Sequence, residues 1–243
     1  MTEQQRTHEK AQARGPVLFI VFVTMGLCSV AVSAWFVGVA VEIGGGFIWD
    51  GLGERHAAHL VEQDLGYIAD APRSLLVGDT IAFSQMLINA VRWPYARFGV
   101  LDRFERDQAD PQPAAPSNRF ARASGQLVST LTRWAVITML IAQDVLLRLS
   151  VALFALPAFA LACLMGALDG VVRRDLRRWS VGRETSFIYH HAKHYVAWSL
   201  TGGFGLYLSW PLGGFNPAVM VLVFTVLVAA TLSTTVGAFK KYA

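Results

Sequence analysis

The sequence predicts an all-α integral membrane protein with four transmembrane helices and with amphipathic helices between the first and the second. Composition is the first reason. Hydrophobic residues make up 54% of the 243 residues and charged residues only 16%, whereas soluble domains carry about 25% charged residues. The second reason is that the apolar residues gather in long runs without charge, and about 20 helical residues are enough to cross a bilayer.

Three apolar runs account for the four crossings. We expect the crossings at residues 16–41, 146–168, 195–211 and 217–239. The last two share one run, which Trp210–Pro217 divides because its two prolines and two glycines favour a tight turn. Pro157 should kink the second crossing, since proline cannot donate to the helical hydrogen-bond ladder. The first run exceeds the roughly 7–15-residue core of a signal peptide, so we favour an uncleaved anchor over a cleaved leader.

The basic residues set the expected orientation, because cytoplasmic loops are rich in lysine and arginine. The tail 1–15 has three basic residues against two acidic ones, and the loop 169–194 has six against three. The tail 240–243 holds two lysines, whereas 42–133 has nine basic residues against eleven acidic ones. The sequence therefore predicts a multi-pass membrane protein, with both termini in the cytoplasm and residues 42–145 outside.

Residues 42–145 are expected to form a periplasmic or interfacial helical region. Apolar side chains recur at helical spacing within 47–68 and 74–104, which predicts about two amphipathic helices at the outer face. Pro94 is expected to divide the second of them. Residues 110–117 hold three prolines within six residues and predict a linker.

Two pairs of opposite charge occur four residues apart, a spacing that places both side chains on one helix face. Asp144 and Arg148 interrupt the apolar sequence, and Asp169 and Arg173 follow the second crossing. We favour a structural ion pair for Asp144 and Arg148, on a helix that starts outside the membrane and enters it near Leu146. The alternative is a polar path, and hence a small channel or transporter, because charge within a membrane is often functional.

The loop 169–194 is expected to form a short helical hairpin. Its first helix carries four arginines in two rows, Arg173 with Arg177 and Arg174 with Arg178, which we call the arginine ridge. Two roles stay open for it. It could hold the phosphates of anionic phospholipid, or it could dock an acidic partner, because arginine offers bidentate donors to both groups.

His190, His191 and His194 are the other candidate cluster. His190 and His194 lie one helical turn apart, which suits a metal, but no third ligand is evident, so we expect no metal and no cofactor. The alternative is a metal-binding membrane protein or a membrane enzyme. The sequence contains no GxxxxGK[ST], GxGxxG or GxSxG motif. We therefore assign no catalytic residue and expect the protein not to be an enzyme.

Small residues recur every four positions in two of the crossings, at Ala158, Ala162 and Gly166 and at Ala229, Ser233 and Gly237. Stripes of small residues let helices approach closely in lipid. They fit packing within one chain as well as a homo-oligomer.

The segment 169–193 resembles a known family. Its sequence, DGVVRRDLRR followed by GRETSFIYHHAK, is similar to that of the integrating conjugative element membrane proteins, which are multi-pass inner-membrane proteins of conjugative plasmids and elements. The similar positions are Asp169-Gly170, Arg173-Arg174-Asp175, Arg177, Arg183-Glu184, Ser186, Tyr189-His190 and Lys193. His191 and His194 do not belong to this pattern.

The resemblance implies a non-enzymatic component of a conjugative DNA-transfer (type IV secretion) system that lies in the bacterial inner membrane and binds or stabilises a TraD-like coupling ATPase. It supplies no catalytic residue, and we expect no direct binding of nucleic acid. The residues expected to bind the partner or lipid are Arg173, Arg174, Arg177, Arg178, Arg183, Glu184 and Lys193. The residues expected in structural ion pairs are Asp144, Arg148 and Asp169.

Overall fold

The described part of the chain contains helices and no strand, which confirms the predicted all-α class. The computed structural model describes residues 16–49, 51–71, 74–109, 119–179, 205–208, 210 and 213–237. The helices are α2 (Pro16–Gly45), α3 (Glu54–Asp70), α4 (Thr80–Arg97), α5 (Val100–Ala109), α6 (Arg119–Phe154), α7 (Leu156–Trp179) and α9 (Pro217–Gly237). Residues 205–208 are also helical.

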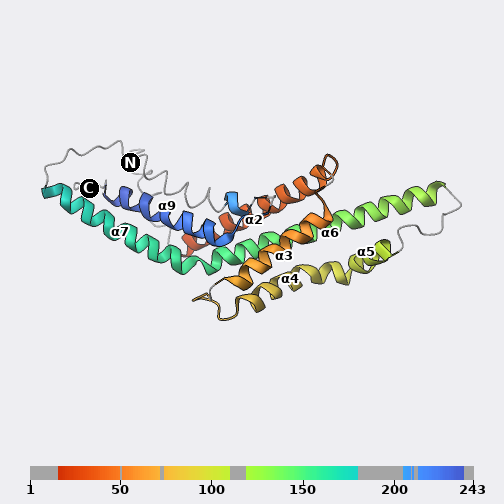
Figure 1. Ribbon diagram of the computed structural model, residues 1–243, viewed down its shortest axis with the longest axis horizontal. Helices are drawn as coiled ribbons and strands as arrows, with labels where there is room; N and C mark the ends of the chain where they lie inside the picture. Colours follow the sequence, from red (N-terminus) through yellow and green to blue (C-terminus); the bar gives the residue numbers. More distant parts are fainter. Residues whose placement is uncertain are drawn as a thin grey trace, which may run out of the picture.

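Helices α6 and α7 lie end to end and form one long, bent axis through the molecule (Figure 1). The break is at Ala155, two residues before Pro157, whose nitrogen has no hydrogen to donate to the carbonyl of Leu153. Hydrogen bonds continue on both sides of it, from Ala155 N–H to Val151 O at 3.0 Å and from Phe159 N–H to Ala155 O at 3.1 Å. The predicted kink at Pro157 is therefore present as the α6/α7 break.

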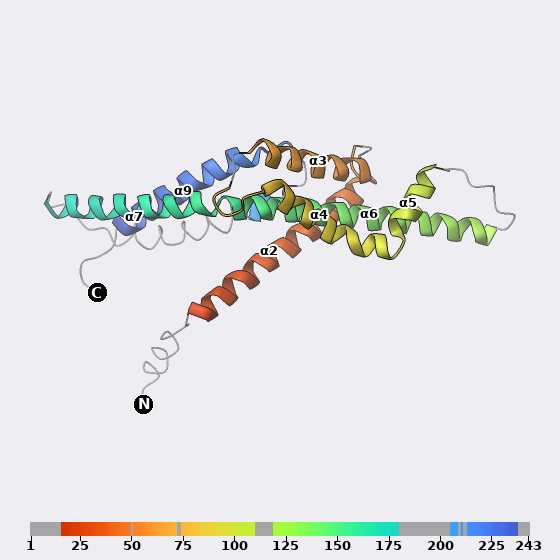
Figure 2. The same cartoon turned by 90° about the horizontal axis from the view of Figure 1, so that it is seen from below.

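Helices α3, α4 and α5 pack along α6, and the C-terminal half of α2 joins them (Figure 2). We call this group the α6 bundle. Its larger core brings Ala34 of α2 and Leu60 of α3 against Ile141 and Val145 of α6. A smaller core combines one residue of α5 with two of α6, namely Leu101, Val136 and Met139. Burial of these apolar side chains stabilises the bundle.

The region before the linker holds three helices, one more than expected, and the prediction that Pro94 divides a helix is wrong. Pro94 lies inside α4, near its end, where the missing N–H removes only one hydrogen bond. The chain turns instead at Phe98 and Gly99, where Gly99 has a φ of 70°. That left-handed conformation favours glycine and ends α4 in the usual way.

Helices α7 and α9 lie side by side and run in the same direction, whereas α2 runs the opposite way (Figures 1 and 2). Their backbones approach closely at two glycines. A Cβ added at Gly166 would lie 2.5 Å from the carbonyl oxygen of Ala229, and one at Gly170 would lie 2.7 Å from Val236 Cβ. The small residues in this part of the chain therefore serve helix packing within one chain.

Within the described residues, four helices are long and apolar enough to cross a membrane, namely residues 24–45, 119–154, 156–176 and 217–237. Their number agrees with the predicted four, but α6 and α7 count separately here and the predicted crossing 195–211 is not among them. The expected crossing 146–168 covers the end of α6 and the start of α7. The expected crossing 195–211 lies mostly outside the described residues, so it stays a prediction, as do the limits of the membrane.

Candidate functional site

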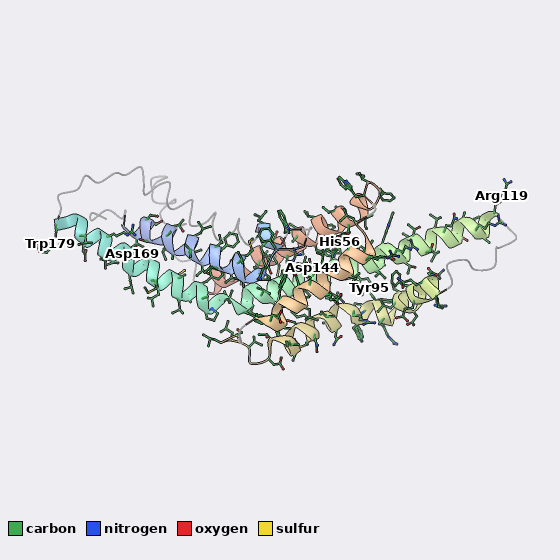
Figure 3. All side chains as sticks on the ribbon, viewed as in Figure 1. His56, Tyr95, Arg119, Asp144, Asp169 and Trp179 are labelled. Carbon is green, nitrogen blue, oxygen red and sulfur yellow. The ribbon has the colours of Figure 1, made fainter. Side chains whose placement is uncertain are left out.

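A buried ionic cluster lies where α3, α6 and the segment 205–210 meet. In α6, Arg148 donates from Nε to Asp64 Oδ2 at 2.9 Å, and its Nη2 lies 3.1 Å from Asp144 Oδ2. The exposed fractions are 4% for Arg148, 6% for Asp64 and 3% for Asp144. Figure 3 shows Asp144 near the middle of the molecule, inside the packed helices. The pair that the sequence predicts is thus part of a three-residue group, which we call the ionic cluster.

Arg148 also binds the main chain of the C-terminal part of the protein. Its Nη1 donates to the carbonyl oxygen of Tyr207 at 3.3 Å and to that of Trp210. These carbonyls belong to the helical residues 205–208 and to Trp210 just after them, where carbonyl groups near a helix end lack helical partners and a cation is favourable. The guanidinium carbon also lies 6.0 Å from the centroid of the Tyr207 ring. Arg148 therefore fastens this segment to the α6 bundle.

A second contact fastens the glycine pair at 213 and 214 to α3. Gln63 Oε1 accepts from the N–H of Gly214 at 3.1 Å. Gly213 and Gly214 have φ values of 64° and 72°, which favour glycine. A Cβ at Gly213 would lie 2.5 Å from Leu60 Cδ2. The tight turn expected between the last two crossings thus rests directly on α3 at its glycine pair.

The sequence analysis missed Asp64, although a signal was present. Asp64 lies four residues after Leu60 and four before Ile68, and both of these are buried. The three side chains therefore share one face of α3. An acid on the buried face of an amphipathic helix needs a buried partner. Only the fold shows that the partner is Arg148, 84 positions away.

The buried Glu42 and the half-buried His56 form a second pair that the sequence analysis did not identify. Glu42 is 1% exposed. Its Oε1 lies 2.5 Å from His56 Nδ1, and its Oε2 accepts from the N–H of Gly53 at 2.7 Å. Gly53 precedes the first residue of α3, where backbone N–H groups lack helical partners. Glu42 therefore ties the end of α2 to the start of α3 and has a structural role.

The arginine ridge begins near the end of α7. Arg173 Nε lies 2.8 Å from Asp169 Oδ2, and the same oxygen accepts from the Ser233 hydroxyl of α9. Arg174 Nε lies 3.7 Å from Asp175 Oδ1. Asp169 thus connects the ridge to the α7–α9 interface. Figure 3 shows Asp169 near the end of α7 where Trp179 lies, whereas Arg119 lies at the opposite end of the molecule.

The other expected site residues have no described side-chain geometry. Residues 177 and 178 belong to α7, but their side chains are outside the description. Arg183, Glu184, Lys193 and the histidines at 190, 191 and 194 lie wholly outside the described residues. Within the part of the chain that the structure describes, no three His, Cys, Asp or Glu side chains gather as a metal site would require.

The comparisons with known proteins give one match. A family model for the IncC plasmid conjugative DNA transfer protein DtrJ-like matches residues 48–240. The match covers most of the α6 bundle, α7, α9 and the segment that carries the arginine ridge. The comparison with curated proteins finds no match. The comparison with solved structures finds none either.

Proposed function

Because the chain belongs to the DtrJ-like family of IncC plasmid conjugative DNA transfer proteins, we propose that it is a non-enzymatic subunit of a conjugative type IV secretion apparatus. In this role it lies in the inner membrane and binds or stabilises the coupling ATPase. The observation that carries the proposal is the family match over three membrane-length helices, α6, α7 and α9, and over the arginine ridge. The match supports a role in DNA transfer, and the partner is our inference.

The surfaces of α2, α7 and α9 support a membrane location. In α7, the exposed fractions of Leu161, Met165 and Leu168 are 60%, 64% and 53%. In α9, those of Leu222 and Val226 are 63% and 59%. Exposed apolar surface of this extent on neighbouring helices is unfavourable in water. Lipid chains would cover it.

The directions of the three helices support the proposed orientation. The start of α2 and the ends of α7 and α9 point toward the same half of the molecule (Figures 1 and 2). In the sequence, basic residues adjoin each of these three ends, namely Arg14 before α2, the arginine ridge in α7 and Lys240 after α9. Because basic residues concentrate on the cytoplasmic side, we place this end in the cytoplasm and the α6 bundle outside.

The ridge suits a partner with clustered carboxylates, such as a soluble or membrane-proximal part of the coupling ATPase. Four arginines lie within six residues, and acids close to them in the sequence are Asp169 and Asp175. Arginine binds carboxylate through two parallel hydrogen bonds, which lysine cannot do. Anionic phospholipid offers phosphate to the same donors, so it is the competing ligand.

Affinity purification from donor cells tests the partner. A tagged chain, extracted in mild detergent, is expected to carry the coupling ATPase with it. Reversal of the ridge, Arg173→Glu with Arg174→Glu, Arg177→Glu and Arg178→Glu, should abolish both the co-purification and DNA transfer. The matched control reverses four exposed arginines of α4 and α5, at positions 92, 97, 103 and 106, and should keep both.

Two results would contradict the proposal. One is a ridge variant that is inserted at the normal level and still supports a normal transfer frequency. The other is a wild-type chain that brings down no coupling ATPase from cells in which transfer is active. If the ridge variant loses membrane insertion while the control keeps it, the ridge acts through lipid rather than through the ATPase.

Cysteine labelling tests the orientation separately. In a chain whose Cys28 and Cys163 are replaced by serine, Gln126→Cys places a thiol on the exposed N-terminal part of α6, and Trp179→Cys places one at the end of α7. A membrane-impermeant maleimide should label position 126 in intact spheroplasts and position 179 only after lysis. The reverse pattern would place the arginine ridge outside the cell and exclude contact with an ATPase inside.

A further inference from the structure

The ionic cluster contains two acidic side chains and only one basic side chain. Its formal charges are two carboxylates against one guanidinium, and all three side chains are at least 92% buried, since the largest exposed side-chain fraction is the 8% of Asp64. A buried carboxylate without a compensating positive charge is strongly unfavourable, and a group in that position normally becomes neutral. Arg148 can compensate only one of the two.

The positions of the oxygen atoms show where a further positive charge would lie. Asp144 Oδ1 is buried and accepts no hydrogen bond from any described residue. The carboxyl groups of Asp64 and Asp144 contact the same guanidinium, at 2.9 Å from Nε and 3.1 Å from Nη2 of Arg148. Two ionised carboxylates beside one guanidinium repel each other, and a proton on either of them removes the repulsion.

Tyr207 lies beside the cluster, with its ring centroid 6.0 Å from the guanidinium carbon of Arg148. The residue is 6% exposed, and its hydroxyl has no hydrogen-bond partner among the described residues. A tyrosine hydroxyl is uncharged at neutral pH, so Tyr207 does not compensate the second carboxylate.

The described helices around the cluster supply no second cation. The only charged residue of α2 is Glu42, which is paired with His56. The arginines of α4, Arg92 and Arg97, are exposed, and α9 contains no charged residue. In α3, the side chain nearest in sequence that could carry a positive charge is His59, which is also exposed.

We propose that Asp64 and Asp144 share one bound proton, so that the ionic cluster is a proton-binding site at the junction of α3, α6 and residues 205–210. With the proton bound, the cluster is neutral and holds this segment through Arg148. Release gives the proton to water and leaves one uncompensated carboxylate in the interior. No other reactant is needed, and the site is independent of the proposed contact with an ATPase.

Infrared spectroscopy of the full chain purified in detergent tests the proton directly. The wild-type protein near neutral pH should show the carbonyl band of a protonated carboxylic acid, and the band should shift on exchange into deuterium oxide. Asp144→Asn and Asp64→Asn should each remove it, because each leaves one carboxylate opposite Arg148. The control Asp102→Asn changes an exposed acid of α5 and should keep the band.

Thermal unfolding gives an independent readout. The folded chain holds the proton, whereas the unfolded chain releases it near the ordinary aspartate value of about 4. Between that pH and the pH at which the folded cluster deprotonates, the folded state binds more protons, so stability falls as pH rises. Asp144→Asn should flatten this part of the profile relative to the wild type, whereas Asp102→Asn should leave it unchanged.

Several outcomes would overturn the proposal. Absence of the carboxylic acid band from the wild type is one, and its persistence in both asparagine variants is another. A third is a wild-type profile whose loss of stability at high pH is prevented by sodium chloride but not by choline chloride, because the cluster would then bind a metal cation instead of a proton. If neither asparagine variant folds, the carboxylic acid band and the pH profile of the wild type still decide whether the folded cluster binds a proton.

Discussion

Helices α6 and α7 are two parts of one long axis, and both are long and apolar enough to cross a membrane, but their apolar side chains meet different surroundings. In the most apolar stretch of α6, 61% of the residues are buried inside the protein, against 22% in α7. The apolar composition of a helix therefore indicates that its surface avoids water. It does not indicate whether protein or lipid covers that surface. Other helices cover α6, whereas lipid is the cover that we propose for α7.

The two helices also contain the same charge motif in different surroundings. Asp144 with Arg148 and Asp169 with Arg173 are both spaced by four residues and both form ion pairs, at 3.1 Å and 2.8 Å. The side chains of the first pair are 4% exposed, and those of the second are 49% and 59% exposed. Removing one partner of a buried ion pair lowers the free energy of unfolding far more than removing one partner of an exposed pair.

The largest expected effect is that of removing the guanidinium in the buried pair. Arg148→Met leaves Asp64 and Asp144 buried without a cation, which should lower the free energy of unfolding by about 3–5 kcal/mol. Arg173→Met removes an exposed partner and should cost about 0–1 kcal/mol. Denaturant unfolding in the same detergent compares the two variants. Equal losses would show that burial does not distinguish the pairs.

Truncation of one leucine in each helix gives the next largest effect. Leu147 of α6 has an exposed fraction of 0%, whereas Leu161 of α7 is 60% exposed. Leu147→Ala leaves a cavity and should cost about 2–5 kcal/mol. Leu161→Ala leaves none and should change stability by about 0.5 kcal/mol or less. The comparison fails if Leu161→Ala is the more damaging change, because α7 would then be covered by protein.

A smaller effect is expected where α7 meets α9. Gly166→Val inserts a side chain where a Cβ alone would lie 2.5 Å from the backbone of Ala229, so it should cost about 1–3 kcal/mol. Gly125 of α6 has no atom within 4 Å of the equivalent position. Gly125→Ala should therefore stabilise the helix by about 0.5–1 kcal/mol. Thermal melts of both variants measure the difference, and a harmless Gly166→Val would show that α7 and α9 do not pack this closely.

Much of the fold follows from sequence periodicity. Charge-free runs and helical spacing predicted the all-α class and the presence of membrane-length helices, and proline chemistry predicted the kink at Pro157. These features depend on backbone chemistry and on nearby residues, so they can be read from a single sequence. The turn at Gly99 was missed because proline and glycine both interrupt helices, and the sequence alone does not rank one above the other.

The candidate site was less predictable. The spacing of four residues identified Asp144 with Arg148 as an ion pair, but the third member, Asp64, lies on another helix. Arg148 also donates hydrogen bonds to the carbonyl groups of Tyr207 and Trp210. Every residue has such a main-chain carbonyl, so the sequence does not reveal which ones bind Arg148. The arginine ridge was found from sequence because charge density and family resemblance are local properties.

The sequence by itself determined that this chain is helical, that it carries apolar segments of membrane length and that a basic segment follows one of them, since each of these depends on residues close together in the chain. Tertiary structure decided which apolar helix is enclosed by protein and which acids share one arginine. The physical reason is that burial and charge compensation depend on neighbours in space, and α3, α6 and residues 205–210 become neighbours only when the chain folds.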